Sequence, residues 1–367
     1  MNSGISENEI KESNLENPYE DYKFPRVRYR GNKQRLVSWI EDCLSKFEFT
    51  TFLDLMGGTG CVGYAFKKKG KQVFYNDILK SNFLIGKSLI ENSEVKLEIK
   101  DIDKLLKPNS GKKNIIQKNY KGLYYKDKEN KWLDNIIANI SNLENEYKKA
   151  IAYNALFQSC IIKKPFGIWH RANLNIRLNK DNKIQTFGNG ITWEKTFEYF
   201  FKRFSEEINQ AIFSNGLDNK AFNEDAFESE LTADIVYIDT PYMRPAKIRE
   251  NSFTDYQYYY HFLEGISNYD IWENNICEEK KTKPYTANVS ERFVDYDRCL
   301  EDFKDLIEKY SDTTIAFSYV EGGKPTINQL KELFESYFDD VSIFKTEHRY
   351  YLRSGNITEC LFIGKSK

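Results

Sequence analysis

The chain has 367 residues, enough for one large domain or two modest ones, and its 54 Lys and Arg residues nearly balance its 55 Asp and Glu residues. A net charge close to zero does not by itself indicate a nucleic-acid binder, so any basic surface must be local. The sequence contains no run of about 18 apolar residues, the length that a membrane-spanning helix requires.

The N-terminal residues and the cysteines further narrow the class of protein to which the chain can belong. Residues 1–23 are polar and acidic and lack the apolar centre of a secretory signal, so we expect them to be a mobile arm. The six cysteines are scattered without metal-ligand spacing, as is typical of reduced thiols in a cytoplasmic protein. With three histidines in the whole chain, we expect no metal site.

The first half of the chain predicts a βαβ unit. Leu36, Ile40 and Leu44 lie on one stripe of a helix. The stretch "TFLDLMGGTGCVGYAFKKKGKQVFYNDI" then predicts a strand at 52–56, a glycine loop, a helix from 62 to 69 and a second strand at 72–75.

The middle of the chain differs from both ends. Residues 86–214 are rich in Lys and Asn and predict helices, whereas strands are expected again at 235–238, 313–319 and 340–346 and in the final "ECLFIG", with a helix at 327–337. We therefore expect an α/β sheet formed by 24–85 and 215–367, interrupted by a helical insertion at 86–214.

The glycine loop allows two functional interpretations. Gly58, Gly60 and Gly63 fit G-x-G-x-x-G after a strand, and Asp77 ends the next strand. In dehydrogenases this pattern lets the backbone approach the pyrophosphate of a dinucleotide, and in methyltransferases it lets the backbone approach S-adenosylmethionine. In both, the acid accepts hydrogen bonds from the ribose hydroxyls. Asp54, inside the first strand, must be hydrogen-bonded to be buried, either to the loop or to the ammonium of a bound amino acid, which favours the methyl donor.

A second polar loop follows the strand at 235–238. In "IVYIDTPYMRP", Asp239 stands at the end of four β-branched or aromatic residues, and Pro241 ends the ladder because it has no N–H. Since parallel strands end at one edge of a sheet, Asp239 and the glycine loop are expected to meet there. One loop can hold a donor and the other an acceptor.

These motifs together resemble the N6-adenine DNA methyltransferases of the Dam-like class, whose catalytic motif is usually DPPY. "DLMGGTGCVG", "YND" and "DTPY" resemble its main motifs, and "RYRGNK" and "NEDAF" resemble two further ones. "KGLYYKDKENKWLDNI", "KKPFGIWHRANL" and "FGNGITWE" resemble the insertion of the FokI-type branch. The resemblance implies a Rossmann-like S-adenosylmethionine-dependent sheet with a mainly helical insertion that recognises DNA.

The resemblance also implies a mechanism. The lone pair of an aromatic amine is delocalised, so acceptors on both N–H bonds are needed to expose it. Asp239 would supply one acceptor and the carbonyl of Thr240 the other, while Tyr242 stacks on a base flipped out of the duplex. Thr240 stands where the family has proline; it keeps the carbonyl, and Pro241 still restricts its backbone.

Further residues are assigned by the same resemblance. Those expected to bind the methyl donor are Tyr29, Lys33, Asp54, Gly57, Gly58, Gly60, Asp77, Asp225 and Asp239. The catalytic segment comprises Asp239, Thr240, Pro241 and Tyr242. Phosphate contacts are expected from cations of the insertion that are interleaved with Phe166 and Trp169, namely Lys163, Lys164, Arg171, Arg177, Lys180 and Lys183.

Several alternatives stay open at this point. The acceptor could be cytosine N4 or an adenine in RNA, the chain could be a catalytically weakened DNA-binding module, or it could be an NAD-dependent dehydrogenase. The last leaves "DTPY" and the basic insertion without a role. The resemblance suggests double-stranded DNA as the substrate and a restriction–modification context with a cognate endonuclease, whereas the recognition sequence depends on groove contacts that one chain does not reveal.

Overall fold

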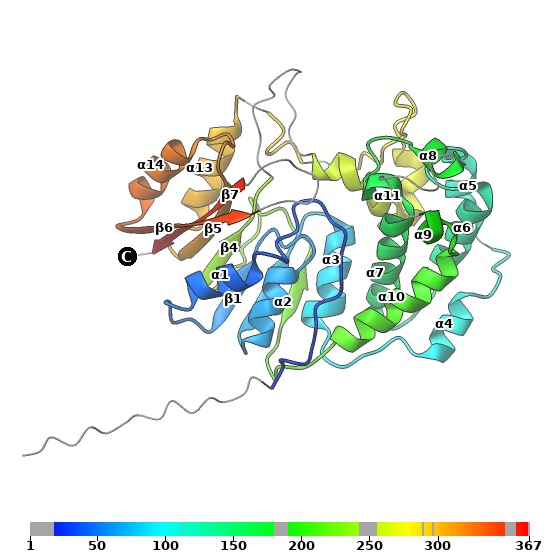
Figure 1. Ribbon diagram of the computed structural model, residues 1–367, viewed down its shortest axis with the longest axis horizontal. Helices are drawn as coiled ribbons and strands as arrows, with labels where there is room; N and C mark the ends of the chain where they lie inside the picture. The colour runs from blue at the N-terminus through cyan, green and yellow to red at the C-terminus, as the bar shows by residue number, and fades with distance from the viewer. Residues whose placement is uncertain are drawn as a thin grey trace, which may run out of the picture.

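A seven-stranded sheet forms the centre of the α/β half of the molecule, with strand order β3-β2-β1-β4-β5-β7-β6 (Figure 1). The computed structural model describes residues 18–111, 113–179, 190–241, 255–287, 290–295, 297–348 and 357–365. The strands are β1 (Thr51–Asp54), β2 (Gln72–Asn76), β3 (Lys220–Phe222), β4 (Ile235–Ile238), β5 (Thr314–Val320), β6 (Asp340–His348) and β7 (Ile357–Lys365). The first five are parallel, and β7 runs antiparallel between β5 and β6. This is the order of a doubly wound sheet with one inserted strand.

The strand β4 lies in the interior of the sheet and pairs with a strand on each side. All four of its residues are buried, as expected for a strand covered on both faces. Val236 pairs with Leu53 of β1 on one side and with Ile315 of β5 on the other. The carboxyl ends of β1, β2 and β4 therefore lie side by side at one edge.

Helices cover both faces of the sheet. Because side chains alternate along a strand, Phe52 and Tyr237 face one hydrophobic cluster while Leu53 and Val236 face the other. The first cluster is packed by α1 (Val37–Leu44), α2 (Cys61–Lys68), α3 (Lys80–Gly86) and η1 (Lys87–Glu91), and the second by α13 (Cys299–Lys309) and α14 (Ile327–Tyr337).

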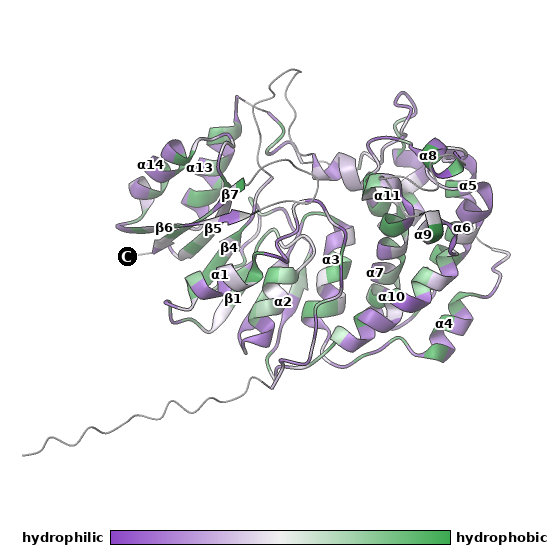
Figure 2. Ribbon diagram, in the orientation of Figure 1, coloured by the Kyte–Doolittle hydropathy of each residue, from purple (hydrophilic) through white to green (hydrophobic). Residues whose placement is uncertain are grey.

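The helical half lies beside α3 (Figure 1). Its elements are α4 (Ile99–Leu105), α5 (Ile115–Asn119), α6 (Asp127–Ser141), α7 (Glu146–Lys163), η2 (Pro165–Gly167), α8 (Leu174–Leu178), α9 (Gly190–Glu194) and α10 (Phe197–Ala211). Helix α7 is buried continuously from Ala150 to Lys163, so it is the axis of this half. Helix α10 carries both hydrophobic and hydrophilic residues, the pattern of a helix with one buried face (Figure 2).

A second segment joins the helical half, which corrects the expected boundary. Helices α11 (Tyr256–Ser267) and α12 (Tyr269–Trp272) and η4 (Glu273–Asn275) belong to the part predicted to be catalytic, 215–367. Phe262 of α11 packs on Tyr120 and Trp169 with ring centroids 5.4 and 5.6 Å apart, and the Trp272 indole donates to the Tyr120 hydroxyl over 3.0 Å. The helical half thus draws on residues on both sides of the β4 strand.

The end of the predicted arm is also packed. The rings of Tyr19 and Tyr22 lie 5.2 and 4.8 Å from that of Phe213, so residues 18–23 belong to the body of the protein; residues 1–17 of the expected arm lie outside the described residues. All six cysteines are free thiols. Within the described parts of the chain, every helix is too short or too polar to cross a bilayer.

Candidate active site

A cavity that is partly open to solvent lies at the carboxyl edge of β1, β2 and β4. The loops after these three strands line it, together with residues 29–33, 224–227, 255–257, 290 and 292–294. Every donor-binding residue named from the sequence, except Gly60, lines this one cavity, and Gly60 is the N-cap of α2, between the lining residues Thr59 and Cys61. The predicted meeting of the two loops therefore takes place.

The glycine loop after β1 has a shape that side chains would prevent. Gly58 and Gly60 have φ of 54° and 74°, in the left-handed region that favours glycine. A Cβ on Gly57 would lie 2.1 Å from the ring of Tyr75, whose hydroxyl donates to the Gly58 carbonyl over 2.7 Å. The bare backbone is therefore exposed to whatever occupies the cavity.

Two buried carboxylates hold this loop. Asp54 accepts a hydrogen bond from the Gly63 N–H at 2.9 Å, and burial raises its pKa to about 7. Asp77 accepts from the Gly58 N–H at 2.9 Å and from the Leu79 N–H at 2.8 Å, and burial raises its pKa to about 6. Of the two roles weighed for Asp54, the loop-holding one is the contact present.

Lys33 and Asp239 form the closest ion pair in the cavity. The Lys33 ammonium lies 2.6 and 2.7 Å from the two carboxylate oxygens of Asp239. Lys33 is 3% exposed and Asp239 20%. Burial raises the pKa of Asp239, and the Lys33 charge opposes that rise. The pair ties the "RYRGNK" turn to the end of β4.

The rest of the "DTPY" segment is partly described. Thr240 is 2% exposed, and within the described part of the chain its hydroxyl has no hydrogen-bond partner. Pro241 lines the cavity, and Tyr242 lies outside the described residues. Asp225 also lines the cavity, and its carboxylate accepts from the Phe227 N–H at 2.9 Å. The ring of Tyr29 stacks on that of Tyr260 at 4.2 Å.

The sequence reasoning missed one wall of the cavity. Asp255, Tyr256 and Gln257 come from the start of α11, and residues 290 and 292–294 face them. The Ser290 N–H donates to the Gln257 side chain at 3.1 Å, which joins the two stretches. No local pattern marks these residues, because their place in the cavity depends on how the helical half packs.

The charges that line the cavity suit a cationic ligand. The carboxylates there are Asp54, Asp77, Glu224, Asp225, Asp239 and Asp255. Three cations, Arg30, Lys33 and Arg292, also line the cavity. The Lys33 ammonium is paired with Asp239, and the Arg292 guanidinium lies 2.9 and 2.8 Å from Asp302 and Asp305. A pyrophosphate would meet mostly negative charge here, whereas an ammonium or sulfonium group would be stabilised.

The cations expected to bind DNA fall into two groups, and one of them requires correction. Lys163, Lys164 and Arg177 have buried side chains. Glu129 lies 2.9 Å from the Lys163 ammonium and 2.7 Å from the Arg177 guanidinium. Burial lowers the pKa of Lys164 to about 7, and its ammonium donates to the Arg171 carbonyl over 2.9 Å. These three hold the helical half together and do not face a DNA backbone.

The second group remains at the surface or outside the described residues. Arg171 is exposed, and Lys180 and Lys183 lie outside the described residues. Of the two interleaved aromatics, Trp169 is fully buried, whereas Phe166 is 51% exposed at a φ of 66°. Only part of the expected basic surface therefore survives in that stretch.

Comparison with known proteins identifies the family. The chain is 28% identical over 355 residues to the type II methyltransferase M2.HphI of Haemophilus parahaemolyticus, covering 94% of this chain and 99% of that protein. It is 23% identical over 342 residues to M.NlaIII of Neisseria lactamica, with 89% and 92% covered. With M.FokI of Planomicrobium okeanokoites it shares 25% identity over 350 residues, which is 89% of this chain and 50% of that protein.

The family model for D12 class N6 adenine-specific DNA methyltransferases matches residues 29–283. This range spans Tyr29, the glycine loop, the first helical segment, Asp239 and α11. The resemblance drawn from the motifs is confirmed, and so is the Rossmann-like methyltransferase sheet. The chain is a member of the D12 class N6 adenine-specific DNA methyltransferase family.

Proposed function

We propose that this protein transfers a methyl group from S-adenosylmethionine to N6 of an adenine flipped out of double-stranded DNA, as the modification half of a restriction–modification system. The observation that carries the proposal is that the glycine loop, Lys33 and Asp239 line one cavity. Family membership supports adenine N6 over cytosine N4 or an RNA adenine as the acceptor.

The donor side of the cavity fits S-adenosylmethionine. When bound, this cofactor supplies a methyl group already activated by a sulfonium. Gly57, Gly58 and Gly60 would let the backbone approach its amino-acid part, since a Cβ on Gly57 would strike Tyr75. The Asp77 carboxylate accepts from the Gly58 and Leu79 N–H groups and from the Asn82 side-chain amide, which leaves acceptor capacity on Oδ1 for a ribose hydroxyl. Asp225 and Phe227, which line the same cavity, would hold the adenine ring.

The acceptor side depends on two oxygen atoms. The Asp239 carboxylate would accept a hydrogen bond from one N6–H and the Thr240 carbonyl from the other, which draws the amine toward tetrahedral geometry and exposes its lone pair. Lys33 would hold the Asp239 carboxylate in one orientation through its two short contacts. Such preorganised dipoles lower the barrier without rearrangement during the reaction. Tyr242, as the stacking partner of the base, stays a prediction.

The decisive experiment detects the modified base. DNA from a host that lacks adenine methylation is incubated with the protein and labelled S-adenosylmethionine, digested to nucleosides and separated. Label in N6-methyladenine supports the proposal. Label in N4-methylcytosine, or transfer to RNA alone, would replace the acceptor, and calorimetric binding of NAD without binding of S-adenosylmethionine would overturn the donor. Sequencing of the modified DNA would then reveal the recognition site.

A further inference from the structure

The segment leading into Tyr29 exposes a row of arginines. Residues 22–29 belong to no helix, strand or turn, and Arg26, Arg28 and Arg30 are exposed while Val27 and Tyr29 between them are partly buried. This alternation of exposure is typical of an extended chain. In an extended chain, alternate side chains point the same way at a repeat of about 6.7 Å, which is close to the separation of successive phosphates along a nucleic-acid strand.

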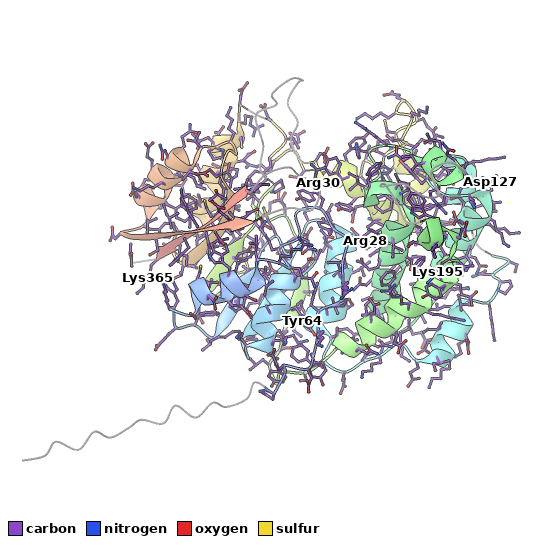
Figure 3. All side chains as sticks on the ribbon, viewed as in Figure 1. Arg28, Arg30, Tyr64, Asp127, Lys195 and Lys365 are labelled. Carbon is purple, nitrogen blue, oxygen red and sulfur yellow. The ribbon has the colours of Figure 1, made fainter. Side chains whose placement is uncertain are left out.

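This segment is fixed between the two halves of the molecule. The Arg30 N–H donates to the Tyr260 hydroxyl over 2.8 Å, and Tyr29 stacks on the same ring. The Arg28 carbonyl oxygen lies 3.8 Å from the position of a Cβ on Gly167, also in the helical half. On the side of the sheet, the Asn82 side-chain amide of α3 donates to the Tyr29 hydroxyl over 3.1 Å. Figure 3 shows Arg28 and Arg30 in the middle of the molecule, between the sheet and the helical half. Arg30 also lines the active-site cavity, so the row ends at its mouth.

Arg171 of the helical half extends the row. The Arg30 guanidinium lies 5.0 Å from the centroid of the Tyr259 ring, and the ring of His170 lies 5.2 Å from the same centroid. Arg171 follows His170 directly and is exposed. The pKa of His170 is lowered to about 4, first by burial and then by Arg171, Lys164 and Arg30, which places positive charge from both halves around this point.

These arginines differ from other cations of the protein in what they contact. No carboxylate within ion-pair distance of Arg26, Arg28, Arg30 or Arg171 is found among the described residues, whereas Lys163, Arg177 and Arg292 are all held by acids. An exposed guanidinium that no carboxylate neutralises remains available for the bidentate contact that it makes with phosphate.

We propose that Arg26, Arg28, Arg30 and Arg171, here called the arginine rim, bind the sugar–phosphate backbone of the duplex beside the flipped-out adenine. This inference rests on the proposed function for its partner, double-stranded DNA. It replaces the buried lysines of α7 as the main source of phosphate contacts. The rim would place the duplex across the cavity mouth, with Lys33 and Asp239 below it.

The test neutralises three rim residues and leaves Arg30 in place, because Arg30 lines the cavity. The variant carries Arg26→Gln, Arg28→Gln and Arg171→Gln. The matched control carries Lys69→Gln, Lys304→Gln and Lys309→Gln, which are exposed and change the net charge equally. Lys69 and Lys309 precede β2 and β5, so they lie toward the opposite edge of the sheet. Affinity for a short fluorescent duplex is measured by polarisation over a series of salt concentrations.

The rim variant should show a salt slope that is shallower by about 0.9 for each lost phosphate contact, so by up to about 2.7. The control should keep the wild-type slope, and the corresponding triple Arg→Lys variant should recover most of it, since lysine also pairs with phosphate. Thermal melting should show that all three variants remain folded, because the altered side chains are exposed.

The failure of this inference can be told apart from that of the proposed function. An unchanged slope in the rim variant, with a wild type that methylates DNA, would overturn the rim and leave the function standing. A shallower slope in the rim variant, with a wild type that binds the methyl donor but modifies no DNA, would support the rim as a DNA-binding surface and overturn the chemistry. A slope lost equally in the control would also overturn the rim.

Discussion

The ammonium of Lys33 and the carboxylate of Asp239, 206 residues apart in the sequence, contact each other through both carboxylate oxygens at 2.6 and 2.7 Å. Either residue alone would destabilise the folded protein here, since a buried charge without a counter-charge is costly. The pair therefore joins the turn at Gly31 to the end of β4 and sets the orientation and charge of the carboxylate proposed to receive the adenine amine.

Replacing Lys33 should shift the pH dependence of methyl transfer. Burial raises the pKa of Asp239 and Lys33 opposes this, so in Lys33→Ala that pKa rises further and the carboxylate is protonated over a wider pH range. We expect kcat/KM to fall about 10²-fold near neutral pH, the scale of one lost electrostatic contact, and its acidic limb to move to higher pH. Lys33→Arg should keep much of the activity, and an acidic limb that stays in place in Lys33→Ala would contradict this role.

Replacing Asp239 should separate stability from chemistry. Asp239→Ala leaves the buried Lys33 ammonium without its carboxylate, and we expect the free energy of unfolding to fall by about 3 kcal/mol. The ion pair therefore requires that stability and methyl transfer be measured together in this variant. The double variant Lys33→Met, Asp239→Ala should recover stability without recovering methyl transfer, as judged by urea unfolding and label incorporation. Transfer by Asp239→Asn at the wild-type rate would show that the carboxylate charge is not needed.

The sequence predicted the elements that carry strong local signals. The strand at 235–238 and the helix at 327–337 match β4 and α14 to the residue, because the first is a continuous apolar run and the second repeats apolar residues at helical spacing. Strand β3 was not foreseen, since its three residues are too few to show a period. The same local signals placed the glycine loop and Asp239 at one edge, because parallel strands leave no other choice.

What the sequence could not predict depends on contacts between distant residues. From the sequence, Lys163 and Arg177 are expected at the surface. In the structure both pair with Glu129, a residue of α6 that is distant from them in the sequence. The part of the cavity wall formed by Tyr256 depends on α11 packing against the helical half. In both cases the sequence gives the type of side chain but not the distant residue that contacts it, and this contact decides whether the side chain is buried.

Gly57→Ala should damage the donor site by a purely steric route. Gly57 needs no left-handed backbone, but a Cβ there would lie 2.1 Å from the Tyr75 ring, and a Cβ on Gly86 would lie 2.2 Å from the same ring, so the ring has little room to move away. We expect a loss of about 1–3 kcal/mol in stability, the usual cost of overpacking, and donor binding at least about tenfold weaker by calorimetry. Gly111→Ala, where the nearest atom is 3.5 Å away, is the control. Partial rescue by Tyr75→Leu would confirm the steric cause, and full donor affinity in Gly57→Ala would refute it.

Asp54 should make the protein less stable as the pH rises. Burial raises its pKa from 3.8 to about 7 in the folded state, so the folded chain holds a proton that the unfolded chain has released. Stability from this group is therefore complete below about pH 4 and is lost as the pH rises toward 7 and beyond, by at most about 4 kcal/mol at about 1.4 kcal/mol per pKa unit. Asp54→Asn, which keeps an acceptor for the Gly63 N–H, should flatten this part of the stability profile in denaturant titrations between pH 5 and 8. An equally steep profile in the variant would assign the effect to other groups.

The hydroxyl of Thr240, at a position where the family usually has proline, is buried and has no hydrogen-bond partner among the residues that the structure describes. If only the main-chain carbonyl of residue 240 receives the adenine amine, the side chain is dispensable. Thr240→Val keeps the N–H and the shape but removes the hydroxyl, so it should raise the free energy of unfolding by about 1 kcal/mol and leave single-turnover methyl transfer unchanged. Thr240→Pro removes the N–H as well and should stay within about tenfold of the wild-type rate, equivalent to about 1.4 kcal/mol. A large gain in Thr240→Pro alone would mean that threonine weakens the enzyme through its backbone freedom. A large loss in both variants would mean that the hydroxyl itself contacts the substrate, which would contradict the carbonyl as the sole contribution of this residue.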